Sequence, residues 1–150
     1  MKRMVVTAVD DVDELIEQYH RAQREFLRGN PETVKDLFSQ REDVTLADPY
    51  GPPVRGWEEV AKAVDHAASL HSDGTFVEWQ ILAKYVTAEL AYVVQIERAE
   101  AKIGAREEIT SLAVRATMNF RPEEDGEWKI VHRHADPITT PQPAESVIQE

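Results

Sequence analysis

The chain has 150 residues, enough for one domain with a buried core. Its 28 acidic and 17 basic residues give a net charge of −11, which argues against binding to a nucleic-acid backbone. The absence of cysteine excludes disulfides, a thiol nucleophile and cysteine-ligated zinc. No apolar run is long enough for a signal peptide or a bilayer-spanning helix, so we expect a soluble protein of the cytoplasm that does not associate with membranes.

The spacing of apolar residues predicts three helices in the first half of the chain, at about 10–28, 31–38 and 57–70. Three aspartates within 10–13 suit the N-terminus of the first helix, because the helix dipole favours negative charge there. Gly29 ends this helix, and Asn30-Pro31 caps and starts the second. After the third helix, Ser72-Asp73-Gly74 is a turn signal.

From residue 75 onward, β-branched and aromatic residues predict four strands, at 75–86, 90–100, 109–121 and 128–136. Their connections are short enough for hairpins, which implies consecutive antiparallel strands. Helices followed by an antiparallel meander predict an α+β domain with its helices packed on one sheet face. The proline-containing tail, 138–150, is expected to be extended or disordered.

The second face of the predicted sheet is also partly apolar. In the strand 90–100, Tyr92, Val94 and Ile96 alternate with Ala91 and Val93. One of the two sheet faces must pack against the helices, which leaves the other exposed. Large exposed apolar patches are uncommon on monomers. The sequence therefore predicts a homodimer that forms through the outer sheet face.

The segment 44–60, VTLADPYGPPVRGWEEV, contains the main candidate for a functional group. A short strand at 44–47 delivers Asp48 into a turn fixed by prolines and flanked by Tyr50 and Trp57. A carboxylate held at a strand end beside aromatic side chains is well placed to act as a general base in an apolar pocket. The alternative is that Asp48 only caps the turn, because Asp-Pro pairs favour turn initiation.

This order of elements, with the segment DVTLADPYGPPVRGWEEV and the closing strand WKIVHRHAD, resembles the SnoaL-like and ketosteroid isomerase-related proteins of the nuclear transport factor 2-like superfamily. The resemblance covers about 11–137, the core of a single expected domain. It implies a cone-shaped, cystatin-like α+β fold, in which three N-terminal helices pack on a curved, mainly antiparallel sheet around an apolar pocket. It also implies dimerisation through the outer sheet face.

The resemblance implies that Asp48 corresponds to the general base of ketosteroid isomerase. That enzyme also uses a tyrosine and a protonated aspartate to hold the developing enolate. Here the tyrosine position falls near Ala22, with Tyr19 about one helical turn earlier, and the aspartate position falls near Ala116. A base without the usual donors argues against genuine steroid isomerase activity.

Three arginines, one from each of three successive strands, are candidates to bind a carboxylate or enolate: Arg98, Arg115 and Arg133. For Arg98 and Arg115 the alternative is a surface pair with a nearby glutamate such as Glu97. Four aromatic residues are also candidate pocket residues: Tyr19, Tyr50, Trp57 and Trp79. For Tyr19, Trp57 and Trp79 the alternative is a core position, although core and pocket wall overlap in a cone-shaped fold.

In the last strand, His132, His134 and Asp136 share one face, and such a set can hold a transition metal. We favour the alternative of hydrogen-bonded strand residues, because no further ligands are evident, and predict neither a metal nor another cofactor. The resemblance places Arg133 in the pocket, but a bulge would reverse the two faces and bring His134 inward. The remaining histidines are interpreted as solvated helix residues: His20, His66 and His71.

Together these observations predict a pocket for a small apolar molecule that bears a carbonyl group. Asp48 would be the base of an isomerase, cyclase or dehydratase, with Arg115, Arg133 or Tyr50 stabilising negative charge. The alternative is a non-catalytic ligand-binding module or a dimeric assembly module of the same fold, which the missing donors favour.

Overall fold

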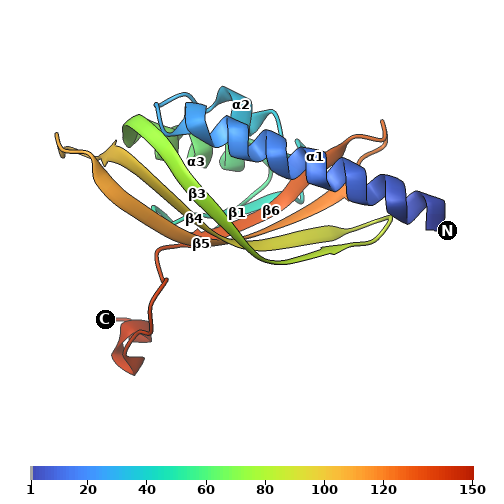
Figure 1. Ribbon diagram of the computed structural model, residues 1–150. Helices are drawn as coiled ribbons and strands as arrows, with labels where there is room; N and C mark the ends of the chain where they lie inside the picture. The colour runs from blue at the N-terminus through green and yellow to red at the C-terminus, as the bar shows by residue number, and fades with distance from the viewer. Residues whose placement is uncertain (1) are drawn as a thin grey trace.

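The computed structural model describes the backbone of residues 2–150 and the side chains of 5–75 and 78–150. Within that part, three α-helices cover one face of a six-stranded sheet with the order β2-β1-β6-β5-β4-β3 (Figure 1). The pairing of β1 with β6 is parallel, and the other pairings are antiparallel. The sheet curves around the helices without closing (Figure 1), which confirms the predicted α+β architecture.

The helices are α1 (Lys2–Phe26), α2 (Glu32–Lys35) and α3 (Trp57–Ser69). The predicted start of the first helix, at the acidic cluster, is wrong, because α1 already begins at Lys2. No glycine or proline interrupts this extension, and the buried Ala8 and Val12 continue one apolar face. Asp13 forms an ion pair with Lys84 instead of marking the helix start. No helix among the described residues is long and apolar enough to cross a bilayer.

The strands are β1 (Thr45–Ala47), β2 (Val54–Arg55), β3 (His71–Val86), β4 (Ala91–Ile103), β5 (Thr110–Pro122) and β6 (Trp128–Asp136). The turn signal at 72–74 does not separate α3 from β3. It is an irregularity inside β3, where the register shifts between Ser72 and Thr75 and Asp73 has a φ of 51°. The backbone at Gly74 passes so close to Leu27 that a side chain would not fit there.

A second irregularity determines which residues of β6 face inward. Phe120 pairs with Ile130, and Asn119 pairs with His132, so Val131 is an extra residue between the two pairs. Before this bulge Ile130 is buried, and after it the buried positions are Arg133 and Ala135. The bulge therefore switches the inward-facing parity along the strand.

The hydrophobic core lies between the helices and the inner sheet face, and its largest buried side chains include Phe38, Met118, Phe120 and Ile130. On the other face Tyr85 of β3 stacks against Tyr92 of β4, with ring centroids 5.8 Å apart. The tail beyond β6 extends away from the sheet on the side opposite the helices (Figure 1) and contains the short 3₁₀ helix η1 (Ala144–Val147).

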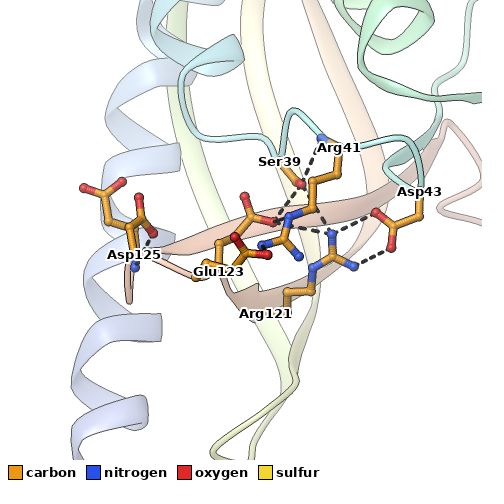
Figure 2. A network of polar contacts seen from close by, with 8 residues as sticks. Ser39, Arg41, Asp43, Arg121, Glu123 and Asp125 are labelled. Carbon is orange, nitrogen blue, oxygen red and sulfur yellow. Dashed lines mark hydrogen bonds and ion pairs between the residues drawn. The ribbon is translucent and has the colours of Figure 1, made fainter.

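A polar network fixes the loop before β1 to the end of β5 (Figure 2). Arg121 donates two hydrogen bonds to Asp43, at 2.6 and 2.8 Å. The fully buried Ser39 donates to Glu123 at 2.9 Å, and Arg41 forms an ion pair with the same carboxylate at 3.1 Å. This network holds the segment that leads into β1, the strand that ends at Asp48.

Candidate functional site

A cavity of about 100 Å³ lies between α1, α3 and the inner face of the sheet. Most of its walls are apolar, with contributions from Phe26, Val64, Leu112 and Val114. A minority of polar side chains also line it: Tyr19, Gln23, Asp48, Tyr50, His71, Glu97 and Arg133. An apolar cavity with a few convergent polar groups is typical of a small-molecule site.

The most buried charges of this site form one ion pair. Arg133 of β6 donates to the two carboxylate oxygens of Glu97 on β4, at 2.9 and 2.7 Å. Gln23 and Gln95 donate to the same carboxylate, at 3.0 and 2.7 Å. Burial alone would raise the pKa of Glu97, but Arg133 and the two amides together hold it below its usual range. The carboxylate is therefore ionised and fully engaged.

Tyr19 of α1 lies beside this pair. The guanidinium of Arg133 stands over its ring, 5.0 Å from the centroid, and Gln23 Nε2 donates to its hydroxyl oxygen at 3.1 Å. Tyr19 is only 3 % exposed, and burial raises the pKa of its hydroxyl, so it keeps its proton at neutral pH. Among the described residues, this hydroxyl takes part in one hydrogen bond, the one that it accepts from Gln23.

Asp48 follows β1 directly, at the edge of the cavity. Its Oδ1 accepts a hydrogen bond from the backbone N–H of Tyr50 at 2.9 Å. The residue is half-buried, and within the described part of the chain it forms no ion pair. Asp48 therefore caps the turn with one oxygen and also lines the cavity. Capping the turn is thus compatible with the predicted role as a general base.

A tyrosine–histidine pair forms another part of the wall. The hydroxyl oxygen of Tyr50 lies 3.1 Å from Nε2 of His71, and Nδ1 of His71 lies 2.8 Å from the carbonyl oxygen of Ala67. Burial lowers the pKa of His71, although its bond to Ala67 counteracts this. The interpretation of His71 as a solvated helix residue is wrong, because it is 6 % exposed and begins β3.

Four of the expected site residues line this cavity together: Tyr19, Asp48, Tyr50 and Arg133. The two tryptophans are not part of its lining. Trp57 packs against the core cluster at the start of α3. Trp79 stacks on His20, with ring centroids 4.1 Å apart, and donates to Gln23 Oε1 at 3.2 Å. Trp79 therefore contacts the site through Gln23, while Trp57 is a partly buried residue that packs against the core.

Arg115 and His134 lie on the outer sheet face instead of the cavity wall. Both contact Asp136, which Arg115 reaches at 2.7 Å and His134 at 3.3 Å. Arg115 has the outward parity of β5, and the bulge in β6 leaves His134 outward while Arg133 turns inward. His132 bonds to Thr45 Oγ1 at 2.7 Å. In the described part of the chain, no group of three or more metal-ligating side chains is arranged to hold an ion.

Three polar cavity residues were not predicted from the sequence: Gln23, His71 and Glu97. The predicted alternative, Glu97 as a surface partner of Arg98 or Arg115, is wrong, because Glu97 is 3 % exposed. The sequence does contain a signal for an inward position of Glu97. Gln95 and Glu97 alternate in step with the apolar Ala91 and Val93, so all four share one face of the strand. The positions expected to supply the usual donors, Ala22 and Ala116, are buried alanines.

Comparisons with known proteins identify relatives of this fold. The family model of the SnoaL-like domain matches residues 12–139. A candidate dehydratase of the nuclear transport factor 2-like family from Streptomyces avermitilis is 23 % identical, covering 89 % of this chain and 98 % of its own, with a TM-score of 0.70. None of the curated proteins is similar enough in sequence to count as a relative.

Two further solved structures have the same degree of structural similarity. A ketosteroid isomerase-like protein from Erwinia carotovora atroseptica is 17 % identical, covering 87 % of this chain and 96 % of its own, with a TM-score of 0.70. A candidate scytalone dehydratase from Novosphingobium aromaticivorans is 15 % identical, covering 95 % and 100 %, also with a TM-score of 0.70. At these identities the likeness establishes the fold, and function must be argued from the site.

Proposed function

Because the chain belongs to the SnoaL-like domain family, we propose that it binds a small apolar carbonyl compound in its cavity and acts on it as an isomerase or dehydratase. Asp48 is the general base in this proposal. The observation that carries it is the hydroxyl of Tyr19, a buried donor at the wall of the cavity that Asp48 also lines. A carbonyl oxygen is the kind of ligand group that such a donor would bind.

The orientation of Gln23 explains why Tyr19 is a donor toward the cavity. The indole N–H of Trp79 can only donate, so the amide oxygen of Gln23 must face it. The amide nitrogen therefore faces Glu97 and Tyr19 and donates to both. Because the Tyr19 oxygen is the acceptor in that bond, its own proton remains available for a ligand.

The proton transfer in this proposal needs one base and one donor. Asp48 removes a proton from the carbon next to the carbonyl, and the C–H electron pair moves into the developing enolate. The enolate oxygen accepts the hydrogen bond from Tyr19. Return of this proton from Asp48 to another carbon of the conjugated system gives an isomer. Alternatively, the enolate electrons form a carbon–carbon double bond as the C–O bond of a β-hydroxyl breaks, and the hydroxyl leaves as water with the proton from Asp48.

In this proposal Tyr19 donates the hydrogen bond to the ligand, and Arg133 assists Tyr19 without contacting the ligand itself. Its two terminal nitrogens already donate to Glu97, while its positive charge lies over the Tyr19 ring. That positive charge stabilises the negative charge that the Tyr19 oxygen gains when its proton is shared with the developing oxyanion. Glu97 in turn keeps Arg133 fixed in place, so we assign both charged residues a positioning role.

Deuterium exchange of the methyl protons of acetophenone in D₂O tests this proposal without knowledge of the natural substrate. We expect the wild-type protein to accelerate exchange, Asp48→Asn to slow it by about 100-fold or more, and Tyr19→Phe to slow it by a similar factor. Two matched controls, Glu89→Gln in an exposed turn and Tyr85→Phe on the outer sheet face, should exchange at the wild-type rate. Exchange in the folded Asp48→Asn variant at the wild-type rate would refute the role of Asp48.

A second candidate is a ligand-binding module without catalysis. It is favoured by the alanine at residue 116, which leaves β5 without a second donor for an enolate. Under this alternative acetophenone binds in the cavity, but its methyl protons exchange at the rate of the protein-free solution. The same exchange experiment therefore separates the two functions.

We also propose that two copies associate through the outer sheet face in the cytoplasm. Exposed and half-buried apolar side chains on β3 and β4 support this: Tyr85, Tyr92, Val94 and Ile96. The net charge of −11 favours a small-molecule ligand over nucleic acid as the partner of the cavity.

A further inference from the structure

We propose that Tyr50 and His71 form a hydrogen-bond acceptor for a hydroxyl group, so that the cavity selects a carbonyl compound that also carries a hydroxyl. This inference rests on the proposed carbonyl ligand and adds a second recognition point to it. It assigns the two tyrosines of the cavity opposite hydrogen-bonding roles.

The position of the proton on His71 follows from its neighbours. Nδ1 lies 2.8 Å from the carbonyl oxygen of Ala67, which can only accept a hydrogen bond. Nδ1 must therefore carry a hydrogen in that contact. In the neutral imidazole, Nε2 is then left with a lone pair and becomes the acceptor.

The tautomer of His71 determines the direction of the next hydrogen bond. The Tyr50 hydroxyl lies 3.1 Å from Nε2, and because Nε2 carries only a lone pair, the hydroxyl must donate its proton to the ring. The oxygen of Tyr50 then has only lone pairs left for a ligand. Asp48, two residues earlier in the same turn, is also an acceptor when ionised.

The surroundings of the two side chains favour this arrangement at neutral pH, although Tyr50 is 37 % exposed and only His71 is buried. Burial lowers the pKa of His71, and partial burial together with the negative charge of Asp48 raises the pKa of Tyr50. His71 is consequently neutral and Tyr50 keeps its proton, which is the combination that the bond between them requires. The ring of Tyr50 also packs edge-on against His71, with centroids 5.7 Å apart, so its hydroxyl is held beside Nε2.

The cavity therefore offers a donor at Tyr19 and acceptors at Tyr50 and Asp48. A ligand carbonyl matches Tyr19, but it has no proton for Tyr50. A ligand hydroxyl can donate to Tyr50, whereas a methyl group of similar size cannot donate a hydrogen bond to that oxygen. Selection for a hydroxyl then comes from Tyr50, independently of the proton transfer at Asp48.

Nitrogen NMR of the ligand-free protein tests the basis of the inference directly. The ¹⁵N shifts and long-range ¹H–¹⁵N couplings of the His71 ring, assigned by loss of its signals in His71→Gln, distinguish the two neutral tautomers. We expect the form with hydrogen on Nδ1 at pH 7. Hydrogen on Nε2, or a protonated ring at that pH, would overturn the inference whether or not a ligand binds.

Calorimetric titration with two matched probes tests the selection itself. Wild-type protein should bind 4-hydroxyacetophenone about threefold to tenfold more tightly than 4-methylacetophenone, the gain expected of one hydrogen bond. Tyr50→Phe should abolish this preference while still binding 4-methylacetophenone, and Tyr85→Phe on the outer sheet face should retain it. Equal affinity of the wild-type protein for the two probes would overturn this inference but not the proposed carbonyl ligand. Failure of wild-type protein to bind either acetophenone would overturn the proposed carbonyl ligand and, with it, this inference.

Discussion

The guanidinium of Arg133 and the carboxylate of Glu97 meet through two hydrogen bonds of 2.9 and 2.7 Å at the wall of the cavity. The two residues come from β6 and β4, which are separated in the sheet by β5. The pair crosses the inner sheet face and holds the guanidinium over Tyr19. Removing one partner of such a buried pair is costly, because the remaining charge has no water to solvate it.

Removing one partner of this pair should destabilise the fold strongly. We expect Glu97→Gln to lower the free energy of unfolding by about 3–5 kcal/mol, because Arg133 would remain charged and buried. The double variant Glu97→Leu with Arg133→Met removes both charges and should recover most of that loss. Urea denaturation followed by circular dichroism measures both values. A double variant less stable than Glu97→Gln would contradict this account of the pair.

The same pair predicts how stability depends on pH. The pKa of Glu97 is lower in the folded chain than in the unfolded chain, where it is about 4.3. Its contribution to stability is therefore fully present above that unfolded value and is lost as the pH falls through the lower folded value. Denaturant titrations between pH 7 and pH 2 should show a smaller acid-dependent loss for the Glu97→Leu, Arg133→Met double variant than for the wild type. The same acid-dependent loss of stability in both proteins would contradict this contribution of Glu97.

The fold and part of the site follow from the sequence for identifiable reasons. Helical and alternating periodicities predicted the elements, and the turn after β1 placed Asp48 at the cavity edge. The position of the bulge at Val131 does not follow from the sequence, because Ile130 and Val131 are similar residues and no turn residue marks the site. As a result, the inward position of Arg133 needed the family resemblance.

The errors at His71 and Glu97 have a common origin. Both are polar residues at buried positions of strands, and neither is an apolar residue that burial patterns would select. The turn signal at 72–74 placed His71 outside the predicted strand 75–86, whereas β3 already begins at His71 and continues through a bulge at 72–75. The polar side chains of a cavity are the positions at which hydrophobic patterning is least informative.

The bulge in β3 predicts a steric effect at Gly74. A Cβ at this position would lie 2.6 Å from the backbone oxygen of Leu27, so Gly74→Ala forces β3 away from the residue that directly follows α1. We expect a loss of about 3 kcal/mol in the free energy of unfolding. Gly51→Ala is the matched control, since nothing lies within 4 Å of its Cβ position, and it should change stability by less than about 1 kcal/mol. Thermal denaturation that shows equal effects for both variants would argue against this packing.

The proposed dimer can be tested on the outer sheet face without disturbing the cavity. Ile96 lies on that face of β4, half-buried in the single chain. Light scattering of the wild-type protein should give the mass of two chains, and Ile96→Glu should give the mass of one, because a charge in an apolar interface is costly to bury. A wild-type mass of one chain at micromolar concentration would rule out a stable dimer.

The claim that Tyr19 donates its proton to a carbonyl ligand has a direct spectroscopic test. The infrared C=O stretching frequency of acetophenone bound to the wild-type protein should be lower than in Tyr19→Phe, because a hydrogen bond weakens the carbonyl bond. The Tyr50→Phe variant should give the wild-type frequency, since Tyr50 donates to His71 instead. The same stretching frequency in wild-type protein and in Tyr19→Phe, with acetophenone bound to both, would contradict the account.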